Sequence, residues 1–441
     1  MIALSAEKIA EILGYNREVV AAEIREVSTD SRKVDEHTLF IAIKGEKFDG
    51  HDFILEVLAK GAPLVVSEHL VQGADERRVI VVEDTLKAFG KLAQYNRRQY
   101  KGTLIALTGS SGKTTTKEEL KAALSAYAPT YATSGNFNNH IGVPRSLLDL
   151  DMNAKYAVIE MGMSARGEIE YLASLAEPDV TLVTNVYPMH IEFLGSLENI
   201  ALAKAEIFSG LRKGGVAIYN ADTAYAEILR DEAQKYAAQV FDYGRTEHPA
   251  VELHLQDDAE HYYYNAWAVL KVVEVLGLPL EKAVTVVNEF GALDGRGKKH
   301  FLNLRGRKVV LIDDSYSGQP DAMKLAIKAL GGIAVSGRKI ALLGKMAELG
   351  KYSKQAHIEV GQELAANKVD VVIGVCEETK DMLAELPAEV LQYYFPSVDG
   401  VAELLNDILK DGDVLLIKGA HYSSQVFKVA AELIKQGEKT T

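Results

Sequence analysis

The sequence predicts an α/β protein of three domains, and three observations support this fold class. Apolar runs of strand length alternate with stretches of helix length, a pattern typical of parallel sheets covered by helices. A glycine-rich turn at residues 109–112 follows one of these strands and opens a helix. A second glycine-flanked segment, DGRG at 294–297, separates two such series and predicts a linker. The chain has 441 residues, which favours roughly two to four domains.

Composition and charge narrow the class of function. The formal net charge of −13 argues against a general nucleic-acid-binding protein, which usually presents a basic surface. The single cysteine, Cys376, excludes a disulfide framework or a cysteine-built metal site. The first residues lack the layout of a signal peptide, and no apolar run approaches the roughly 18 residues that span a bilayer. We therefore expect a cytoplasmic enzyme or binding protein without a membrane span.

The alternation also predicts where the domains begin and end. Residues 1–97 are expected to form a small α/β domain, with short strands such as LFIAI and PLVVS. Residues 98–297 are expected to form a central domain with a mostly parallel sheet, because YAVIE and VTLVTN are continuous apolar runs. Residues 298–441 repeat the pattern with strands such as KVVLI and DVLLI, which predicts a doubly wound third domain.

The motif TLIALTGSSGKTTTKEEL predicts a nucleotide triphosphate site. Glycines let backbone N–H groups turn toward phosphate oxygens, and the helix N-terminus favours negative charge. Lys113 would reach the β- and γ-phosphates of ATP, and the Thr114 hydroxyl would hold Mg²⁺. Leu107 stands where the longer form of this motif has its first glycine, so a glycine turn with a chance lysine is the alternative. The predicted phosphate-binding residues are Gly109, Ser110, Ser111, Gly112, Lys113 and Thr114.

Two side chains at the ends of later strands are candidate magnesium ligands. Glu160 ends the strand YAVIE, and His190 follows the strand VTLVTN. Both fall at carboxyl ends of predicted parallel strands, where α/β sheets bind ligands. Mg²⁺ prefers oxygen ligands and keeps several waters, so these two side chains could complete the coordination of one or two ions. A solvated glutamate and a structural histidine are the alternatives.

Seven segments together resemble the Mur ligase family, the ATP-dependent amide ligases of peptidoglycan precursor synthesis. They match that family in order and spacing over essentially the whole chain, and several motifs in the right order are more specific than one. The segments are TGSSGKTTTKE, GNFNNHIGVPRSLL, AVIEMGMSARGEI, HIEFLGSLENIALAKAEIF, DDSYSGQPDAM, LGKMAELG and VLLIKGA.

The resemblance implies a fold and a reaction. The implied fold has an N-terminal UDP-binding domain, a central P-loop ATPase domain and a C-terminal Rossmann-like domain. The implied reaction activates a carboxylate as an acyl phosphate and couples it to an amine, adding D-alanyl-D-alanine to UDP-N-acetylmuramoyl-tripeptide. ATP and Mg²⁺ are the implied cofactors, and the partners are these small molecules without nucleic acid. A monomer is expected.

The resemblance also assigns roles to residues. The implied UDP-sugar contacts are Ser31, Arg32, Lys44, Gly45 and His51. The implied further nucleotide contacts are Thr115, Asn265, Arg296, Asp314 and Tyr316. Lys204 corresponds to a lysine that many members carry as a carbamate, which would make it a metal ligand; a surface lysine is the alternative. Lys418 would contact the incoming substrate. The implied catalytic set is Lys113, Glu160, His190 and Lys204.

Several positions depart from the family pattern, and they bear on the identity of the amine. His140 and Lys345 stand where the pattern has acids, Tyr262 replaces an asparagine, and His421 replaces an arginine. The stretch at 245–260 is also short, so a strand-rich part of the central domain is expected to be missing. A diverged paralogue that joins another acid and amine is therefore one alternative. A catalytically silent nucleotide-binding protein is the other.

Overall fold

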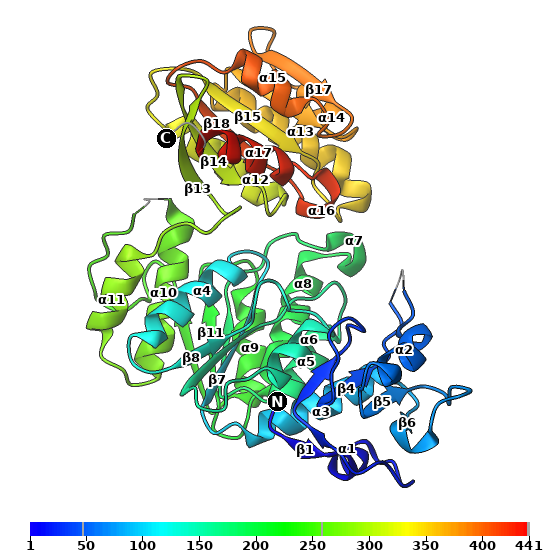
Figure 1. Cartoon of the computed structure of the whole chain (residues 1–441). Helices are drawn as coiled ribbons and strands as arrows, with labels where there is room; N and C mark the ends of the chain where they lie inside the picture. Colours follow the sequence, from blue (N-terminus) through cyan, green and yellow to red (C-terminus); the bar gives the residue numbers. More distant parts are fainter. Residues whose placement is uncertain (46–47, 257–258, 439–441) are drawn as a thin grey trace.

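The computed structural model describes residues 1–45, 48–256 and 259–438, and Figure 1 shows their arrangement. Three parallel or mostly parallel sheets follow one another along the chain, each covered by helices. The predicted α/β fold class is confirmed. Among the described residues, no helix is long and apolar enough to cross a membrane.

The N-terminal part is built on a four-stranded parallel sheet. Its strands lie in the order β3 (Glu26–Ser28), β4 (Thr38–Ile41), β5 (Leu64–Ser67) and β6 (Val79–Val81). A short antiparallel pair, β1 (Leu4–Ser5) and β2 (Glu23–Ile24), lies beside it. The helices of this part are α1 (Ala6–Leu13), α2 (Ile54–Ala59) and α3 (Thr85–Gln99).

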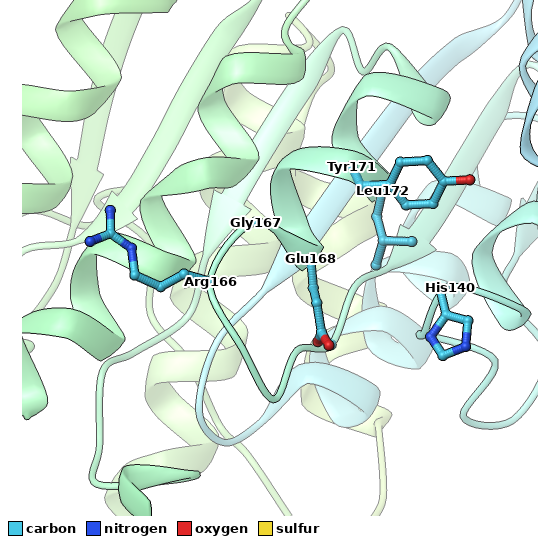
Figure 2. A pocket seen from close by; sticks show the side chains of 7 residues that line it. His140, Arg166, Gly167, Glu168, Tyr171 and Leu172 are labelled. Carbon is cyan, nitrogen blue, oxygen red and sulfur yellow. The ribbon is translucent and has the colours of Figure 1, made fainter. Parts of the chain in front are cut away.

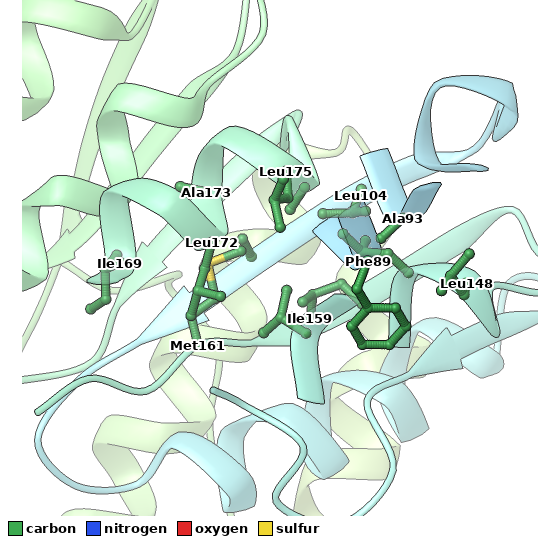
Figure 3. Packing of buried hydrophobic residues seen from close by; sticks show 14 of the residues in the cluster. Phe89, Ala93, Leu104, Leu148, Ile159, Met161, Ile169, Leu172, Ala173 and Leu175 are labelled. Atoms are coloured by element: carbon green, nitrogen blue, oxygen red, sulfur yellow. The ribbon is translucent and has the colours of Figure 1, made fainter. Parts of the chain in front are cut away.

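Helix α3 joins the N-terminal part to the central domain through one continuous hydrophobic core. Figure 3 shows Phe89 and Ala93 of α3 packed with central-domain residues such as Leu104, Ile159 and Leu172. Each of these side chains is at most 1% exposed, so the two parts share their buried surface. The expected boundary at residue 97 falls inside this helix and stays a prediction.

The central domain contains a six-stranded parallel sheet. The strand order is β12 (Gln239–Tyr243), β11 (Val216–Asn220), β10 (Val180–Val183), β7 (Thr103–Thr108), β9 (Tyr156–Glu160) and β8 (Thr130–Ala132). One face is covered by α4 (Lys113–Ser125), α10 (Glu260–Val275) and α11 (Leu280–Glu289). The other is covered by α5 (Gly142–Leu148), α6 (Glu168–Ala176), α8 (Leu197–Ala205) and α9 (Ala226–Tyr236).

Both faces of this sheet are apolar, which explains the continuous hydrophobic runs in its strands. Ile105 and Leu107 of β7 pack toward α4 and α10, whereas Leu104 and Ala106 pack toward the opposite core. Between β12 and α10 the chain forms no strand in residues 244–256 or at residue 259. The short stretch predicted there also includes residues 257–258, which lie outside the described residues.

The third domain contains a six-stranded sheet with one antiparallel edge. The order is β13 (Lys298–Leu304), β14 (Arg307–Asp314), β18 (Val414–Lys418), β15 (Lys339–Gly344), β16 (Val371–Val375) and β17 (Leu391–Phe395), and only β13 runs antiparallel. One core includes α12 (Pro320–Gly332), α13 (Ser353–Ala366) and α14 (Thr379–Leu383). The opposite core includes α15 (Val401–Ile408) and α17 (Phe427–Glu438).

The DGRG linker is hydrogen-bonded to the third domain. The backbone N–H of Gly297 donates to the Asp313 carbonyl at 2.8 Å, and Tyr316 N–H donates to the Gly295 carbonyl at 3.0 Å. Gly295 and Gly297 have φ values of +71° and +86°, which glycine adopts without strain. The expected boundary at residue 297 immediately precedes β13 and stays a prediction.

Candidate functional site

The glycine-rich loop after β7 has the conformation that its motif predicts. Gly112 has a φ of +78° and precedes the first residue of α4, so the loop ends at a helix N-terminus. At Gly109 a Cβ atom would lie 1.8 Å from the Thr184 hydroxyl oxygen, which leaves no room for any side chain. Close backbone approach and positive φ therefore explain these two glycines. The loop presents backbone N–H groups to an anion.

The loop following β10 holds the glycine-rich loop in place. Ser110 N–H donates to the Asn185 carbonyl at 3.0 Å, and Ser111 N–H donates to the Asn185 side-chain oxygen at 2.8 Å. The Ser110 hydroxyl donates to the Tyr187 carbonyl at 3.0 Å and accepts from Tyr187 N–H at 2.9 Å. Ser110 therefore braces the loop, and the phosphate contact that the sequence predicted for it stays a prediction.

Lys113 lies folded back on this loop. Its Nζ donates to the Gly109 carbonyl at 2.7 Å. Burial lowers its pKa, the Glu160 carboxylate acts in the opposite sense, and Arg296 adds to the lowering. An anionic phosphate bound here would interact with a desolvated positive charge. That interaction is electrostatically stronger than one with a solvent-exposed charge.

Arg296 of the linker connects the central domain to the third domain. Its Nη2 donates to the Thr114 hydroxyl oxygen at 2.9 Å, and its guanidinium carbon lies 4.2 Å from the centre of the Tyr316 ring. The second contact has the geometry of a cation–π interaction. The structure thus brings together three residues that the sequence predicted at the nucleotide site.

Glu160 lies where the parallel register places it beside the loop. It is the last residue of β9 and is paired with Leu107 of β7. Its side chain is 1% exposed, and Oε1 accepts from the Asn138 amide at 2.8 Å. Oε2 is buried and has no hydrogen-bond partner among the described residues, and Lys117 Nζ is 3.8 Å away. A buried carboxylate oxygen without a hydrogen bond is a suitable ligand for a cation.

Lys204 is buried, contrary to the alternative of a surface lysine. It lies near the end of α8 and is 2% exposed, and its side chain forms no hydrogen bond or ion pair with any described residue. Burial lowers its pKa well below the ordinary value, and the charge of Lys113 acts in the same direction. Its ammonium form is therefore disfavoured, and the neutral amine is more populated than in an exposed lysine.

His190 pairs with a residue of the third domain. Its Nδ1 contacts a carboxylate oxygen of Glu348, and this contact lowers the pKa of Glu348. Both residues have positive φ, +58° and +60°, which is uncommon for side chains other than glycine. Within the described ranges, no three His, Cys, Asp or Glu side chains gather closely enough to hold a metal ion by themselves. The magnesium ligands stay a prediction.

Asp314 and Lys418 contact each other. They are directly paired in the register of β14 and β18, and Lys418 Nζ donates to Asp314 Oδ2 at 2.6 Å. Lys418 is 2% exposed. Its charge is therefore compensated inside the third domain, and it does not line the cleft described next.

A cleft of about 670 Å³ lies between the central and third domains. From the central domain it is lined by the glycine-rich loop, Glu160, His190 and Lys204. Tyr316 and residues 420–423 line it from the third domain, and Arg296 of the linker lies between the two sides. Among the predicted central residues, Thr115 is buried in α4, and Asn265 lies behind the loop, where its side-chain oxygen accepts from Thr116 at 3.2 Å.

The predicted UDP contacts lie apart from this cleft, on loops of the N-terminal sheet. Ser31 and Arg32 follow β3, and Arg32 forms two hydrogen bonds of 2.8 Å with Asp30, which hold the pKa of that carboxyl well below its usual range. Lys44 Nζ lies 3.8 Å from Asp49. These charges are exposed, so their pairing contributes little to stability and leaves them accessible.

Gly45 and His51 complete the predicted set. Gly45 N–H donates to the Phe48 carbonyl at 2.9 Å in the loop that follows β4. His51 Nδ1 lies 2.6 Å from an Asp49 oxygen, and Nε2 accepts from Glu68 N–H at 3.2 Å. Both ring nitrogens of His51 therefore have partners within the domain, and the roles of all five residues stay predictions.

Sequence reasoning missed several residues that shape the site. Asn138 holds Glu160, Asn185 braces the loop, and Glu348 contacts His190. Lys117 is fully buried beside Glu160 and donates to the Gly135 carbonyl at 2.8 Å. The only sequence signal for Lys117 was that it directly follows the threonines of the loop. Its burial depends on strands far away in the chain, which no local pattern indicates.

Comparisons with known proteins match this architecture. Residues 23–97 match the Mur ligase family catalytic domain, residues 107–276 match the Mur ligase middle domain, and residues 301–421 match the Mur ligase glutamate ligase domain. The Bacillus subtilis UDP-N-acetylmuramoyl-tripeptide–D-alanyl-D-alanine ligase is 35% identical, and the match covers 84% of this chain and 85% of that protein.

Two solved structures are similar over nearly the full length. The UDP-N-acetylmuramoylalanyl-D-glutamyl-2,6-diaminopimelate–D-alanyl-D-alanyl ligase of Acinetobacter baumannii has a TM-score of 0.85 at 29% identity, covering 98% of both chains. The Thermotoga maritima MurF ligase in complex with ADP has a TM-score of 0.80 at 28% identity, covering 95% of this chain and 99% of that one. These similarities show that the chain belongs to the Mur ligase family.

Proposed function

We propose that this chain is an ATP-dependent ligase that adds D-alanyl-D-alanine to UDP-N-acetylmuramoyl-tripeptide in peptidoglycan precursor synthesis. The names of the Bacillus subtilis and Acinetobacter baumannii relatives support this activity, and the latter names 2,6-diaminopimelate as the third residue. The ADP complex of the Thermotoga maritima relative supports a nucleotide site.

The observation that carries the proposal is the composition of the interdomain cleft. A phosphate-binding loop, a buried carboxylate oxygen of Glu160 and a buried amine of Lys204 face one space from the central domain. The third domain faces the same space, and Arg296 of the linker donates a hydrogen bond to Thr114 of the central domain. A reaction between three substrates needs such a site, which can hold a nucleotide and an acid on one side and admit an amine from the other.

The chemistry follows from the charges of the reactants. A carboxylate is a poor electrophile, so its oxygen first attacks the γ-phosphorus, and the bond from that phosphorus to ADP breaks. Lys113 and Arg296 lie where they offset the repulsion between the two anions. The amine nitrogen then forms a bond to the acyl carbon, the bond from carbon to the phosphate oxygen breaks, and the amine loses a proton. The products are an amide, ADP and phosphate.

The residues present fit a magnesium site. Oε2 of Glu160, which is buried and accepts no hydrogen bond from a described residue, and the hydroxyl of Thr114 are oxygen ligands of the type that Mg²⁺ prefers. His190 keeps Nε2 on the ring edge opposite its contact with Glu348. When bound, the ion would neutralise phosphate charge. We further propose that Lys204 carries a carbamate, because a buried amine with a lowered pKa reacts more readily with carbon dioxide and becomes an anionic oxygen ligand.

Phosphate release tests the proposed reaction. The protein is assayed with ATP, Mg²⁺ and UDP-N-acetylmuramoyl-tripeptide, with and without D-alanyl-D-alanine. We expect release that depends on both the acceptor and the dipeptide, and amide product identified by mass spectrometry. Lys113→Ala serves as the inactive control. ATP binding without turnover for any acid and amine would instead identify a silent nucleotide-binding protein.

A diverged paralogue with another amine is the second candidate, and the third-domain face of the cleft favours it. His421 occupies the position of a family arginine, and its ring stacks on Phe427 with centroids 4.1 Å apart. Lys345 occupies a position where the family pattern has an acid, and its Nζ lies 3.1 Å from a carboxylate oxygen of Glu378. A panel of D- and L-dipeptides in the same assay separates the two candidates, because only the paralogue would prefer an amine other than D-alanyl-D-alanine.

A further inference from the structure

A loop of the central domain, residues 134–140, runs along the cleft, and we call it the asparagine loop. Asn136, Asn138 and Asn139 of this loop line the cleft. Every residue of the loop is exposed except Asn138, which is half-buried. Apolar packing therefore contributes little to the position of the loop, and hydrogen bonds have to hold it in place.

The end of the loop also borders a hollow. His140, its last residue, lines a second cavity of about 480 Å³ on the central domain. Figure 2 shows His140 together with Glu168 and Tyr171 of α6, which line the same hollow. Because the loop lies between the cleft and this cavity, its polar anchors decide where its asparagines lie.

Lys117 of α4 supplies one of these anchors. Its side chain is fully buried, and Nζ donates to the Gly135 carbonyl at 2.8 Å. Glu118 Oε1 lies 3.0 Å from the same nitrogen, so the charge of Lys117 has a close partner. Glu160 Oε2 is 3.8 Å away, which is too far for a hydrogen bond. Lys117 therefore connects the helix of the phosphate loop to the asparagine loop without occupying Glu160 Oε2.

The asparagine loop in turn fixes Glu160. The side-chain amide of Asn138 donates to Glu160 Oε1 at 2.8 Å, and the Asn138 carbonyl accepts from Gly162 N–H at 2.8 Å. Thr133, directly before the loop, accepts from Glu160 N–H at 3.1 Å through its hydroxyl oxygen. Displacement of the loop would therefore move the amide that orients the Glu160 carboxylate. A chain of contacts thus runs from Lys117 through the loop to Glu160.

Stability alone does not account for a lysine at this position. Burying an ammonium group costs desolvation energy, and replacing a buried ion pair by apolar residues is often neutral or stabilising. The side chain of Lys117 is 0% exposed and that of Glu118 is 30% exposed, so this cost falls mainly on the lysine. A methionine of similar length could fill the same space, but it could not donate to the Gly135 carbonyl.

We propose that Lys117 is a positioning residue for the magnesium site, which anchors the asparagine loop so that Asn138 keeps Glu160 oriented for Mg²⁺. The inference rests on the proposed function and adds to it a residue that acts on the metal through Glu160. Lys117 and Glu118 form a pair without net charge. Loss of the anchor should therefore outweigh any relief of repulsion between the ammonium group and the metal ion.

The binding of adenylyl-imidodiphosphate, a non-hydrolysable ATP analogue, separates the metal from the phosphate loop. Calorimetry gives its Kd in Mg²⁺ and in EDTA, and the ratio of the two is the Mg²⁺ enhancement. Lys117→Met should reduce this enhancement about 10-fold or more, the usual effect of removing a group that orients a metal ligand. The Kd in EDTA should stay within about 2-fold of the wild-type value, because the phosphate loop keeps its own hydrogen bonds. A purely structural role would weaken binding under both conditions alike.

Phosphate release gives a second readout. The apparent KM for Mg²⁺ should rise about 10-fold in Lys117→Met, with a much smaller change in kcat at saturating Mg²⁺. Lys117→Gln, which is uncharged and shorter, should show the same loss, and it replaces the methionine variant if thermal unfolding shows that the latter does not fold. Lys121→Met is the matched control: this lysine lies one turn later in α4, is exposed and lines neither cavity. Its Mg²⁺ enhancement should stay within about 2-fold of the wild-type value.

Glu160→Gln tests whether Lys117 acts through Glu160. The carboxylate is already absent in that background, so adding Lys117→Met should change the Mg²⁺ enhancement by less than about 2-fold. A further full loss there would overturn the inference, and so would an unchanged enhancement in Lys117→Met alone or no enhancement in the wild-type protein. A larger enhancement in Lys117→Met would show that the lysine acts only as a competing charge. Absence of phosphate release would instead contradict the proposed function, while the binding measurements would still test Lys117.

Discussion

Glu119 provides a stability test that does not depend on the reaction. It lies in α4, directly after the phosphate loop, and is 4% exposed. Its carboxyl has no hydrogen bond or ion pair with any residue that the structure describes. Burial raises its pKa from 4.5 to about 8. At neutral pH the folded protein therefore holds this proton, whereas the unfolded chain has released it.

The sign and size of the effect follow from proton linkage. Stability falls with rising pH wherever the folded state binds more protons than the unfolded state, which here spans 4.5 to about 8. Each pKa unit corresponds to about 1.4 kcal/mol. Between about pH 5.5 and about pH 7.5, this one group should lower the free energy of unfolding by about 2.5 kcal/mol. Glu119→Gln removes the titration and keeps the shape.

Thermal unfolding at the two pH values measures the effect. A change of this size corresponds to roughly 5–10 °C in Tm for a unit of 150–250 residues. When the pH is raised, the Tm of the wild-type protein should fall by that much more than the Tm of Glu119→Gln. Glu281→Gln, at an exposed position on the neighbouring helix α11, is the control and should keep the wild-type trend. Identical pH trends in Glu119→Gln and wild type would refute the assignment of a neutral buried carboxyl.

The remaining predictions concern the cleft. Lys113→Ala should reduce the rate of phosphate release by about 10²-fold or more. Its circular dichroism spectrum should be unchanged, since the side chain contacts the loop and not the core. A wild-type rate in this variant would contradict the role of Lys113. Lys204→Ala should lose activity that added short-chain carboxylates partly restore, and wild-type activity without them would exclude a carbamate. Gly109→Ala should abolish ATP binding in calorimetry, because the new Cβ would lie 1.8 Å from the Thr184 hydroxyl. Adding Thr184→Ala should restore part of that binding, and no recovery would point to backbone strain instead.

Much of the fold was predictable because its signals are local. Continuous apolar strands such as YAVIE require cover on both faces, and the structure places helices on both sides of β9. The glycine loop was predictable for the same reason, since strand, turn and helix occupy fewer than about 20 consecutive residues. Helix α3 shows the limit of such reasoning, because its buried face joins two domains in one core, and no short pattern in its sequence predicts that packing.

The site was predicted as a set of residues but not as an arrangement. Asp314 and Lys418 were expected to bind different ligands, yet the register of β14 and β18 pairs them with each other. His190 was expected as a metal ligand within the catalytic set, and it also contacts Glu348 of the third domain. Such pairings depend on strand order and on how the domains meet, which no short stretch of sequence encodes.

The sequence by itself determined the α/β class, the phosphate loop and the family resemblance, because each is written in short patterns or in the order of several motifs. Only the tertiary structure decided that the Lys204 side chain is buried without a partner among the described residues, and that Glu160 keeps one buried carboxylate oxygen without a hydrogen bond there. The physical reason is that burial and electrostatic environment arise from contacts between distant residues. The free energy of a buried charge therefore depends on neighbours that only folding brings together.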